Sequence, residues 1–408
     1  MSEQERMPSA IVAALGLTQI IGYGTLYYSF SILAPDMAEE AGWTVDAVFA
    51  VFSVALLVGG LAAPVLGSMM DRFGARGMMA LGSLFAAFAL ALCAYSASAS
   101  VFIAAIILLE VASSMVQYQA AFATLVQFRP MVAAKSITYL TLIGGFASTL
   151  FWPITSSLHG LYTWREIYLF YAVLNLAVCA PIHVWVMRRK PVEHAGAESM
   201  TGRREVHGVL RPDRRRVGFY VASAAFALQG FALSSMLVHM VPMLTQLGLG
   251  AAAVMVSTIF GPSQVLSRLI NMLFGQRLSA TTLATLAAMM IVGGIVTLLV
   301  SGGWIAGAAV FALLLGLGSG VNSIAQGALP LHLFGSNGYG SLTGKMAAIR
   351  LSAGAAAPFV FAALTENFSM TVSLAITAAL GGLGLAGFMI LGHLALGSAR
   401  NDTLRGTE

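Results

Sequence analysis

The sequence predicts an all-α integral membrane protein with twelve transmembrane helices. Of its 408 residues, 58% are hydrophobic and only 9% are charged, and the mean hydropathy is +0.86. Soluble domains contain roughly half apolar residues, so this composition lies far outside their range. Apolar runs of about 18 residues or more recur along the whole chain. Each is long enough to cross the hydrocarbon core of a bilayer as a helix.

Polar interruptions between the apolar runs divide the chain into twelve predicted spans. Six precede the longest polar segment and six follow it. This predicts an N-terminal half over residues 1–187, a linker over 188–216 and a C-terminal half over 217–408. The 43 glycines favour close helix approach in such a bundle. The predicted spans are 9–35, 46–69, 77–97, 99–126, 134–158, 165–187, 217–246, 250–273, 280–301, 303–328, 341–364 and 370–397.

The linker 188–216 carries nine Lys or Arg residues and four acids, an excess of five positive charges. It has no aromatic residues interleaved with the basic ones, and it lies between membrane spans, so we expect no nucleic acid partner. Loops rich in Lys and Arg stay on the cytoplasmic side of a membrane. The linker is therefore predicted to be cytoplasmic.

A cytoplasmic linker fixes the predicted side of every other loop. Both chain termini then lie in the cytoplasm, and the protein is predicted to be a multi-pass protein of the cytoplasmic membrane. On the opposite face only Arg165 remains as a basic residue. The residues predicted on the cytoplasmic side with the linker are Arg6, Arg72, Arg76, Arg129, Lys135, Arg277, Arg400 and Arg405.

The short turn between the second and third spans reads GSMMDRFGAR over residues 67–76. Its pattern G-x-x-x-D-R-x-G-x-R resembles the loop 2–3 signature of the major facilitator superfamily. The residues that match are Gly67, Asp71, Arg72, Gly74 and Arg76. The resemblance implies two similar six-helix halves, a gating role for this turn, and a solute carrier that works by alternating access rather than an enzyme.

The second half of the chain holds a weaker copy of the same turn. It reads NMLFGQRLSA over residues 271–280, and Arg277 aligns with Arg72. Gln276 then stands where the first half has Asp71, and we expect any salt-bridge role of that acid to be lost in this half.

Two arginines fall inside predicted spans. Arg268 lies nine residues before Arg277, and Arg350 lies about 15 Å into the span 341–364. Either cation costs roughly 2.5–3.5 kcal/mol on insertion scales unless it faces a cavity or a partner. Of the 16 acids, only Glu110 is equally deep. One positive charge is left unmatched, and an anionic solute is the simplest compensation. The planar guanidinium fork favours a carboxylate.

A structural alternative remains open for these charges. Arg350 can pair with Glu110, while Arg268 is satisfied by Gln264, Asn271 and backbone carbonyl groups. In that arrangement neither arginine would serve a solute.

The placement of the cations resembles the oxalate/formate antiporter and monocarboxylate transporter branches of the superfamily. The resemblance implies that Arg268 binds a substrate carboxylate and that Arg350 or Lys345 supplies a second cation. We prefer Arg350, because Lys345 lies only about one turn into its span. The first span, LTQIIGYGTLYYSFSIL, resembles the opening span of these branches. It lacks the acidic residue common in monocarboxylate carriers.

Other polar residues are candidate ligands of the solute. Gln19, Tyr23 and Tyr27 fall within about an 80° arc of the first span. Asn322 and Gln264 could also face a cavity. Each of these side chains could instead serve contacts between helices. Glu110 is the candidate proton-coupling residue, because buried carboxyl groups form proton relays in transporters.

We therefore predict a secondary transporter of a small organic anion, a mono- or dicarboxylate, that works by proton symport or anion exchange. The alternative within transporters is proton-driven efflux of toxic, amphipathic or metalloid compounds. A sensor built on the same fold is a third possibility. No phosphate-binding G-x-x-x-x-G-K-[ST] loop is present. We expect no catalytic residues, no metal site and no cofactor. The expected partners are a small anionic solute, protons and the lipid bilayer.

Overall fold

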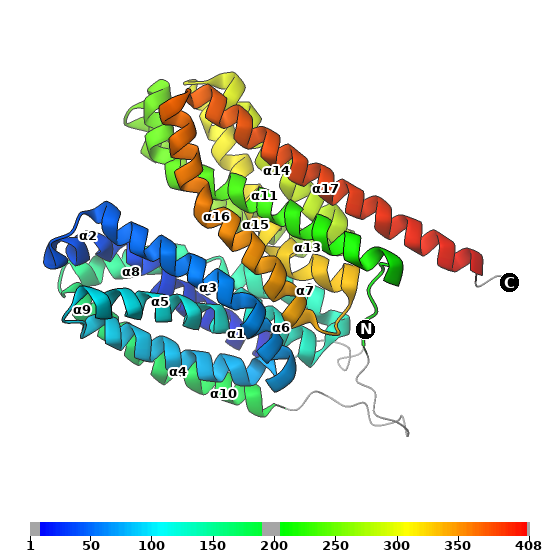
Figure 1. The fold of residues 1–408 in the computed structure, drawn as a ribbon, viewed down its shortest axis with the longest axis horizontal. Coiled ribbons are helices and arrows are strands. Elements are labelled where there is room, and N and C mark those ends of the chain that lie inside the picture. Colours follow the sequence, from blue (N-terminus) through cyan, green and yellow to red (C-terminus); the bar gives the residue numbers. More distant parts are fainter. Residues whose placement is uncertain (1–8, 190–204, 406–408) are drawn as a thin grey trace. The chain divides into compact units, whose positions relative to one another are not determined.

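The computed structural model describes residues 9–189 and 205–405, and these form almost entirely helices (Figure 1). Within these described ranges, twelve helical stretches are long and apolar enough to cross a membrane. Each coincides with one predicted span, so the predicted fold class is confirmed. The stretches are longer than the apolar runs at several ends. For example, the span predicted over 217–246 is helical over Pro212–Leu249, because its polar flanks continue the helix. Arg6 and linker residues 190–204 lie outside the described residues.

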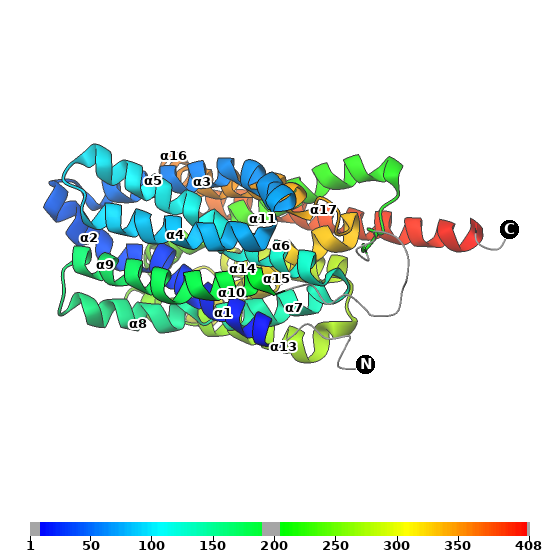
Figure 2. The same ribbon diagram turned by 90° about the horizontal axis from the view of Figure 1, so that it is seen from below.

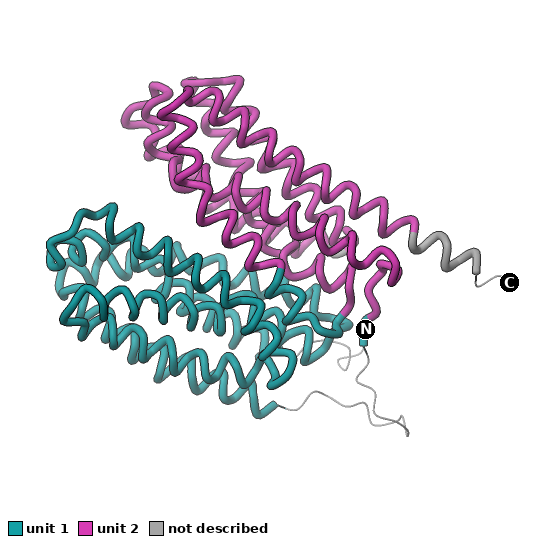
Figure 3. The backbone as a smooth tube through the Cα atoms, in the orientation of Figure 1, with its two compact units in different colours: residues 1–206, 336–345 teal, residues 207–335, 346–408 magenta. Residues whose placement is uncertain are grey.

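The chain forms two compact units (Figure 3). The first comprises residues 1–206 and 336–345, and the second comprises residues 207–335 and 346–408. The first seven residues of helix α16 therefore belong to the first unit, and the rest of that helix belongs to the second.

The first unit contains ten α-helices, two π-helical segments and the start of α16 within the described residues. Its elements are α1 (Ser9–Tyr23), η2 (Gly24–Tyr28), α2 (Ser29–Ala41), α3 (Val45–Phe73), α4 (Ala75–Ala94), α5 (Ala99–Val116), α6 (Tyr118–Phe128), α7 (Pro130–Gly144), α8 (Ala147–His159), α9 (Trp164–Leu174), η3 (Asn175–Cys179) and α10 (Ala180–Arg188). Helix α4 packs against α5, α9 and α10, and it runs beside α10 in two perpendicular views (Figures 1 and 2).

The second unit is built around α15. Its elements are α11 (Pro212–Leu244), η4 (Thr245–Leu249), α12 (Ala252–Ser257), α13 (Phe260–Phe274), η5 (Gly275–Arg277), α14 (Ala280–Ser301), α15 (Ile305–Phe334), α16 (Tyr339–Asn367) and α17 (Met370–Arg405). Helix α15 packs against α13 and α14, while α17 packs against α11 and α14. An apolar core that includes Met236, Ile291 and Phe311 fills the space between these helices.

The fourth span is interrupted, which the sequence did not predict. Helix α5 ends at Val116 and α6 begins at Tyr118. Between them Gln117 has an extended backbone, with φ −80° and ψ −167°. A break in a membrane helix leaves carbonyl groups without helical partners, and these need donors from neighbouring side chains. The side chain of Gln19 on α1 supplies one, since its Nε2 donates to the carbonyl oxygen of Val116 at 2.8 Å.

Candidate functional site

Arg268 lies on α13 in the second unit and is 4% exposed. Its Nε donates a hydrogen bond to Oγ of Ser323 on α15 at 3.2 Å. Its Nη1 is buried and has no hydrogen-bond partner among the described residues. Within that part of the chain, no carboxylate oxygen lies within ion-pair distance of this guanidinium group. The guanidinium group of Arg268 thus lies buried in the second unit with a hydroxyl oxygen as its hydrogen-bond partner.

Ser323 is oriented to accept from Arg268. Its own hydroxyl proton is donated to the carbonyl oxygen of Gly320 at 2.7 Å, which leaves the lone pairs of its oxygen to accept from Arg268. Because the hydrogen bond to Ser323 occupies Nε of Arg268, the Nη end of the guanidinium group remains for another partner. Two parallel N–H groups at that end match the spacing of carboxylate oxygens.

Of the side chains predicted as alternative partners of Arg268, Gln264 bonds elsewhere, and Oδ1 of Asn271 accepts no hydrogen bond within the described residues. Nε2 of Gln264 donates to Oγ of Ser319 at 2.9 Å, and Arg268 forms its one hydrogen bond within the described residues to Ser323. The arrangement in which Gln264 and backbone carbonyls satisfy Arg268 is not formed. Asn322, on the same helix as Ser319, is 3% exposed, and its Oδ1 is buried without a hydrogen-bond partner among the described residues.

Glycines on α15 bring α13 close enough for these contacts. A Cβ atom added to Gly320 would lie 2.0 Å from Oγ of Ser267 and 2.3 Å from the carbonyl oxygen of Gln264. One turn earlier, a Cβ atom on Gly316 would lie 2.4 Å from the carbonyl oxygen of Phe260. Small residues spaced by four let membrane helices approach to backbone contact. This spacing places Arg268 within reach of α15.

Arg350 lies on α16 in the second unit and is partly buried. Its stem packs over Gly230 of α11, where an added Cβ atom would lie 3.0 Å from Cγ of Arg350. Lys345, the other candidate for a second cation, is exposed and belongs to the first unit. The two candidates therefore differ in burial and in the unit that holds them.

Glu110 lies on α5 in the first unit and is 6% exposed. Its Oε1 is buried and has no hydrogen-bond partner within the described residues. The backbone of α3 is close by, because a Cβ atom on Gly59 would lie 3.0 Å from the carbonyl oxygen of Glu110. The predicted deep carboxyl group is thus enclosed by the first unit.

The three predicted ligands of the first span have different surroundings. Gln19 is fully buried and supports the interruption of the fourth span, as described above. Tyr23 is partly buried, and its ring centroid lies 4.8 Å from that of Tyr118. Tyr27 is 41% exposed, and its ring centroid lies 5.9 Å from that of Phe52. The π-helical segment Gly24–Tyr28 adds an extra residue per turn here, which helical spacing alone does not anticipate.

The turn over residues 67–76 joins α3 to α4 in the first unit. Asp71 accepts hydrogen bonds from the backbone N–H groups of Gly340 at 2.9 Å and Ser341 at 2.7 Å, in the first turn of α16. A carboxylate there complements the positive end of the helix dipole. Gly67 permits the contact, because an added Cβ atom would lie 2.1 Å from the carbonyl oxygen of Gly340. Gly74 has a φ of +90°, which allows the sharp turn.

The basic residues of the two turns have other contacts. The guanidinium carbon of Arg72 lies 5.2 Å from the ring centroid of Phe73. Nη1 of Arg76 donates to the carbonyl oxygen of Arg189 at the end of α10. In the second unit Arg277 ends the short helix η5 and is exposed. The side chain of Gln276 lies outside the described part of the structure.

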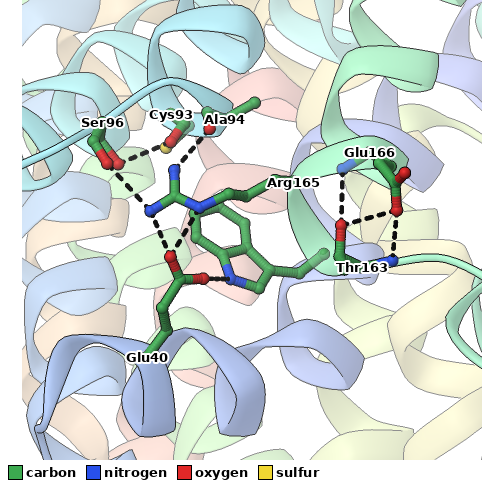
Figure 4. Close-up of polar contacts among 8 residues, drawn as sticks. Glu40, Cys93, Ala94, Ser96, Thr163, Arg165 and Glu166 are labelled. Atoms are coloured by element: carbon green, nitrogen blue, oxygen red, sulfur yellow. Dashed lines mark hydrogen bonds and ion pairs between the residues drawn. The ribbon is translucent and has the colours of Figure 1, made fainter.

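Arg165 is fully engaged by protein atoms at the end of the first unit opposite the turn 67–76 (Figure 4). Its Nη2 lies 2.7 Å from Oε1 of Glu40 and donates to the carbonyl oxygen of Ser96 at 2.9 Å. Nε1 of Trp164 donates to the second carboxylate oxygen of Glu40 at 2.6 Å. This network joins α2, the end of α4 and α9. It identifies Arg165 as a structural residue.

The described residues thus hold twelve helical stretches long and apolar enough to cross a membrane, which is typical of a multi-pass membrane protein. The sequence profile of the Major Facilitator Superfamily matches residues 15–358, and the chain belongs to this family. Proteins of this family and fold are transporters and not enzymes. The resemblance to the superfamily is confirmed, whereas the oxalate/formate and monocarboxylate branches remain predictions. The comparison with curated proteins finds no match.

Solved structures of major facilitator transporters share the fold. The human organic anion transporter MFSD10 (TETRAN) has a TM-score of 0.71 at 15% identity, over 95% of this chain and 100% of the other. The E. coli fucose:proton symporter FucP has a TM-score of 0.71 at 12% identity, over 94% of this chain and 99% of the other. The proton:xylose symporter XylE has a TM-score of 0.69 at 12% identity, over 93% and 95%.

Sequence reasoning missed Ser323, the residue that contacts Arg268. Two signals could have indicated it. Ser319 and Ser323 are spaced by four and therefore share one face of a helix. The segment GLGSG over residues 316–320 is a small-residue motif of the kind that lets two membrane helices touch. Together they predict a polar helix face against a close neighbour.

Proposed function

We propose that this major facilitator protein transports a small organic anion, a mono- or dicarboxylate, by alternating access. The observation that supports this most is the state of Arg268. A guanidinium group that is 4% exposed has one hydrogen bond and no carboxylate partner among the described residues. Such a group is costly in a membrane protein unless something compensates its charge. An anionic solute is suited to that role and would bind at the Nη end.

The other residues are assigned around this cation. Arg350 is proposed as the second clamp, and Asn322, Gln264 and Tyr27 as polar neighbours of the solute. Gln19 and Tyr23 are supported less, because both make contacts that stabilise the first unit.

Glu110 is proposed as the proton-coupling residue. It is buried and has an unpartnered carboxylate oxygen. A carboxyl group in the membrane changes its charge when it binds or releases a proton, which is how such groups couple transport to a proton gradient. We propose proton symport when Glu110 cycles its proton, and anion exchange when it does not.

The turn over residues 67–76 is proposed to act in gating on the cytoplasmic side. Asp71 bonds to the first turn of α16, and a change of state would have to break this contact or carry both partners together. The predicted orientation, with the linker and both termini in the cytoplasm, rests on the excess of basic residues in the linker.

Transport by the purified protein tests the proposal. Radiolabelled mono- and dicarboxylic acids would be presented to proteoliposomes with and without an imposed pH gradient, each beside its uncharged amide. We expect at least one acid to enter and its amide to be excluded, because an amide cannot compensate the charge of Arg268. Equal entry of an acid and its amide, or transport of uncharged or cationic compounds alone, would contradict the proposal.

A further inference from the structure

Helix α16 contains a proline at position 358, eight residues after Arg350. Proline has no backbone N–H group, so the carbonyl oxygen four residues earlier, on Gly354, loses its partner within the helix. Such a carbonyl group is costly inside a membrane protein unless another donor reaches it. The second unit provides this donor from a neighbouring helix.

Ser234 on α11 donates a hydrogen bond from Oγ to the carbonyl oxygen of Gly354 at 2.8 Å. Serines and threonines in helices usually donate to a carbonyl of their own helix, as Thr245 does to Val241 at 2.9 Å. Ser234 instead donates across to α16, to the one carbonyl oxygen that Pro358 deprives of its helical N–H. Its hydroxyl group therefore replaces the missing backbone donor.

Two more side chains of α11 contact the same stretch of α16. Oγ of Ser235 donates to the carbonyl oxygen of Ala357 at 3.3 Å. Nε2 of His239 lies 3.0 Å from the carbonyl oxygen of Pro358 and is the donor of that pair. Ala357 precedes the proline. Its carbonyl oxygen can still accept the helical hydrogen bond from the backbone N–H group of residue 361. Ser235 thus resembles Ser234 in chemistry but does not serve the carbonyl freed by proline.

The same face of α11 holds the stem of Arg350. Gly230 lies one turn before Ser234, and Arg350 lies one turn before Gly354, so the two pairs face each other. A Cβ atom on Gly230 would lie 3.0 Å from Cγ and 3.4 Å from the carbonyl oxygen of Arg350. A shift of this stretch of α16 against α11 would therefore displace the arginine as well.

We propose that Ser234 is a positioning residue for Arg350. By bonding to Gly354 it holds the stretch of α16 around Pro358 against α11, and this sets where the Arg350 stem lies over Gly230. The link to solute binding rests on the proposed function, in which Arg350 is the second clamp. The hydrogen bond between Ser234 and Gly354 does not depend on the proposed function.

A double-mutant cycle between Ser234→Ala and Pro358→Ala tests the proposal. Alanine at position 358 restores a backbone N–H group that can bond to Gly354. In the native background we expect Ser234→Ala to raise the KM of the transported solute about five- to tenfold, with a smaller change in maximal rate. In the Pro358→Ala background we expect less than about a twofold change, because the carbonyl already has its donor. Ser235→Ala is the matched control, and its effect should be equal in both backgrounds.

The melting temperature of the purified variants gives a reading that needs no solute. Ser234→Ala should lower it in the native background and leave it nearly unchanged beside Pro358→Ala. This holds even if the solute is not an organic anion, so failure of the proposed function is distinguishable from failure of the inference. Equal effects of Ser234→Ala on the melting temperature in both backgrounds would overturn the inference. Coupling in melting temperature without any change in KM would uphold the contact with Gly354 and contradict the assignment of Arg350 as the second clamp.

A second pair of variants covers the case in which Pro358→Ala does not fold. Ser234→Thr keeps the hydroxyl donor, whereas Ser234→Val has the same shape as threonine without it. We expect the threonine variant to retain a KM near that of the native protein and the valine variant to raise it. Indistinguishable KM values for the two would overturn the proposal.

Discussion

At the scale of single residues, the protein separates its buried charges. Arg268 in the second unit has a hydroxyl group as its hydrogen-bond partner and no carboxylate within the described residues. Glu110 in the first unit has a carboxylate oxygen without a hydrogen-bond partner there. Isolated ionisable groups of this kind are rare in membrane segments and mark functional sites. Each therefore supports a separate prediction.

Replacement of Glu110 by glutamine removes the titratable proton and keeps the size of the side chain. We expect Glu110→Gln to abolish the acceleration of net uptake by an acidic exterior, while exchange of internal for external solute continues. The reason is that exchange needs no net proton movement. Initial rates of both modes in proteoliposomes between pH 5 and 8 provide the measurement.

Glu39→Gln is the matched control, because Glu39 is an exposed acid of the same unit. This variant should keep the native pH profile. An unchanged pH profile in Glu110→Gln would exclude Glu110 as the proton carrier.

At the scale of elements, glycines on α15 leave no side chains at two contacts, so two neighbouring helices can pack closely against it. Gly316 and Gly320 lie against α13, and Gly318 lies against Ile291 of α14. This packing brings Ser323 to Arg268, so the candidate site depends on helix separation. Added volume in such a contact costs about 1–3 kcal/mol and moves the backbones apart.

We expect Gly320→Ala to lower the melting temperature and to raise the KM for the solute, because its Cβ atom would lie 2.0 Å from Oγ of Ser267. Gly293→Ala on α14 is the control, since an added Cβ atom there meets nothing within 4 Å. That variant should be neutral or slightly stabilising, because alanine favours a helix more than glycine does. Equal losses in the two variants would show that helix separation is not the cause.

Some features of the helices could be predicted from the sequence and others could not. Apolar runs predict all twelve spans, because length and hydropathy suffice for them. They do not predict the break at Gln117, where neither proline nor glycine marks the chain. Gln19 donates to the carbonyl group that this break exposes on Val116, so its role could not be predicted from the sequence either. Pro358 is visible in the sequence, but the donor that serves Gly354 comes from a helix 120 residues away.

At the scale of the whole molecule, the family and fold are those of a secondary transporter. The predicted residues fall into separate groups. Glu110, Tyr27 and the turn with Asp71 belong to the first unit, while Arg268, Gln264, Asn322 and Arg350 belong to the second. The burial and charge of Arg268 could be predicted by counting along its span from Arg277. Its contact with Ser323 could not, because that contact depends on how α13 packs on α15.

The central claim is that the unmatched guanidinium group of Arg268 binds the solute. Uptake of the transported acid by proteoliposomes containing Arg268→Lys and Arg268→Ala tests it most directly, with Arg216→Lys as a control at an exposed arginine. We predict that lysine lowers kcat/KM about tenfold or more, because a point charge does not reproduce the fork, that alanine abolishes uptake, and that the control is unchanged. Native rates of uptake by the alanine variant would contradict the account.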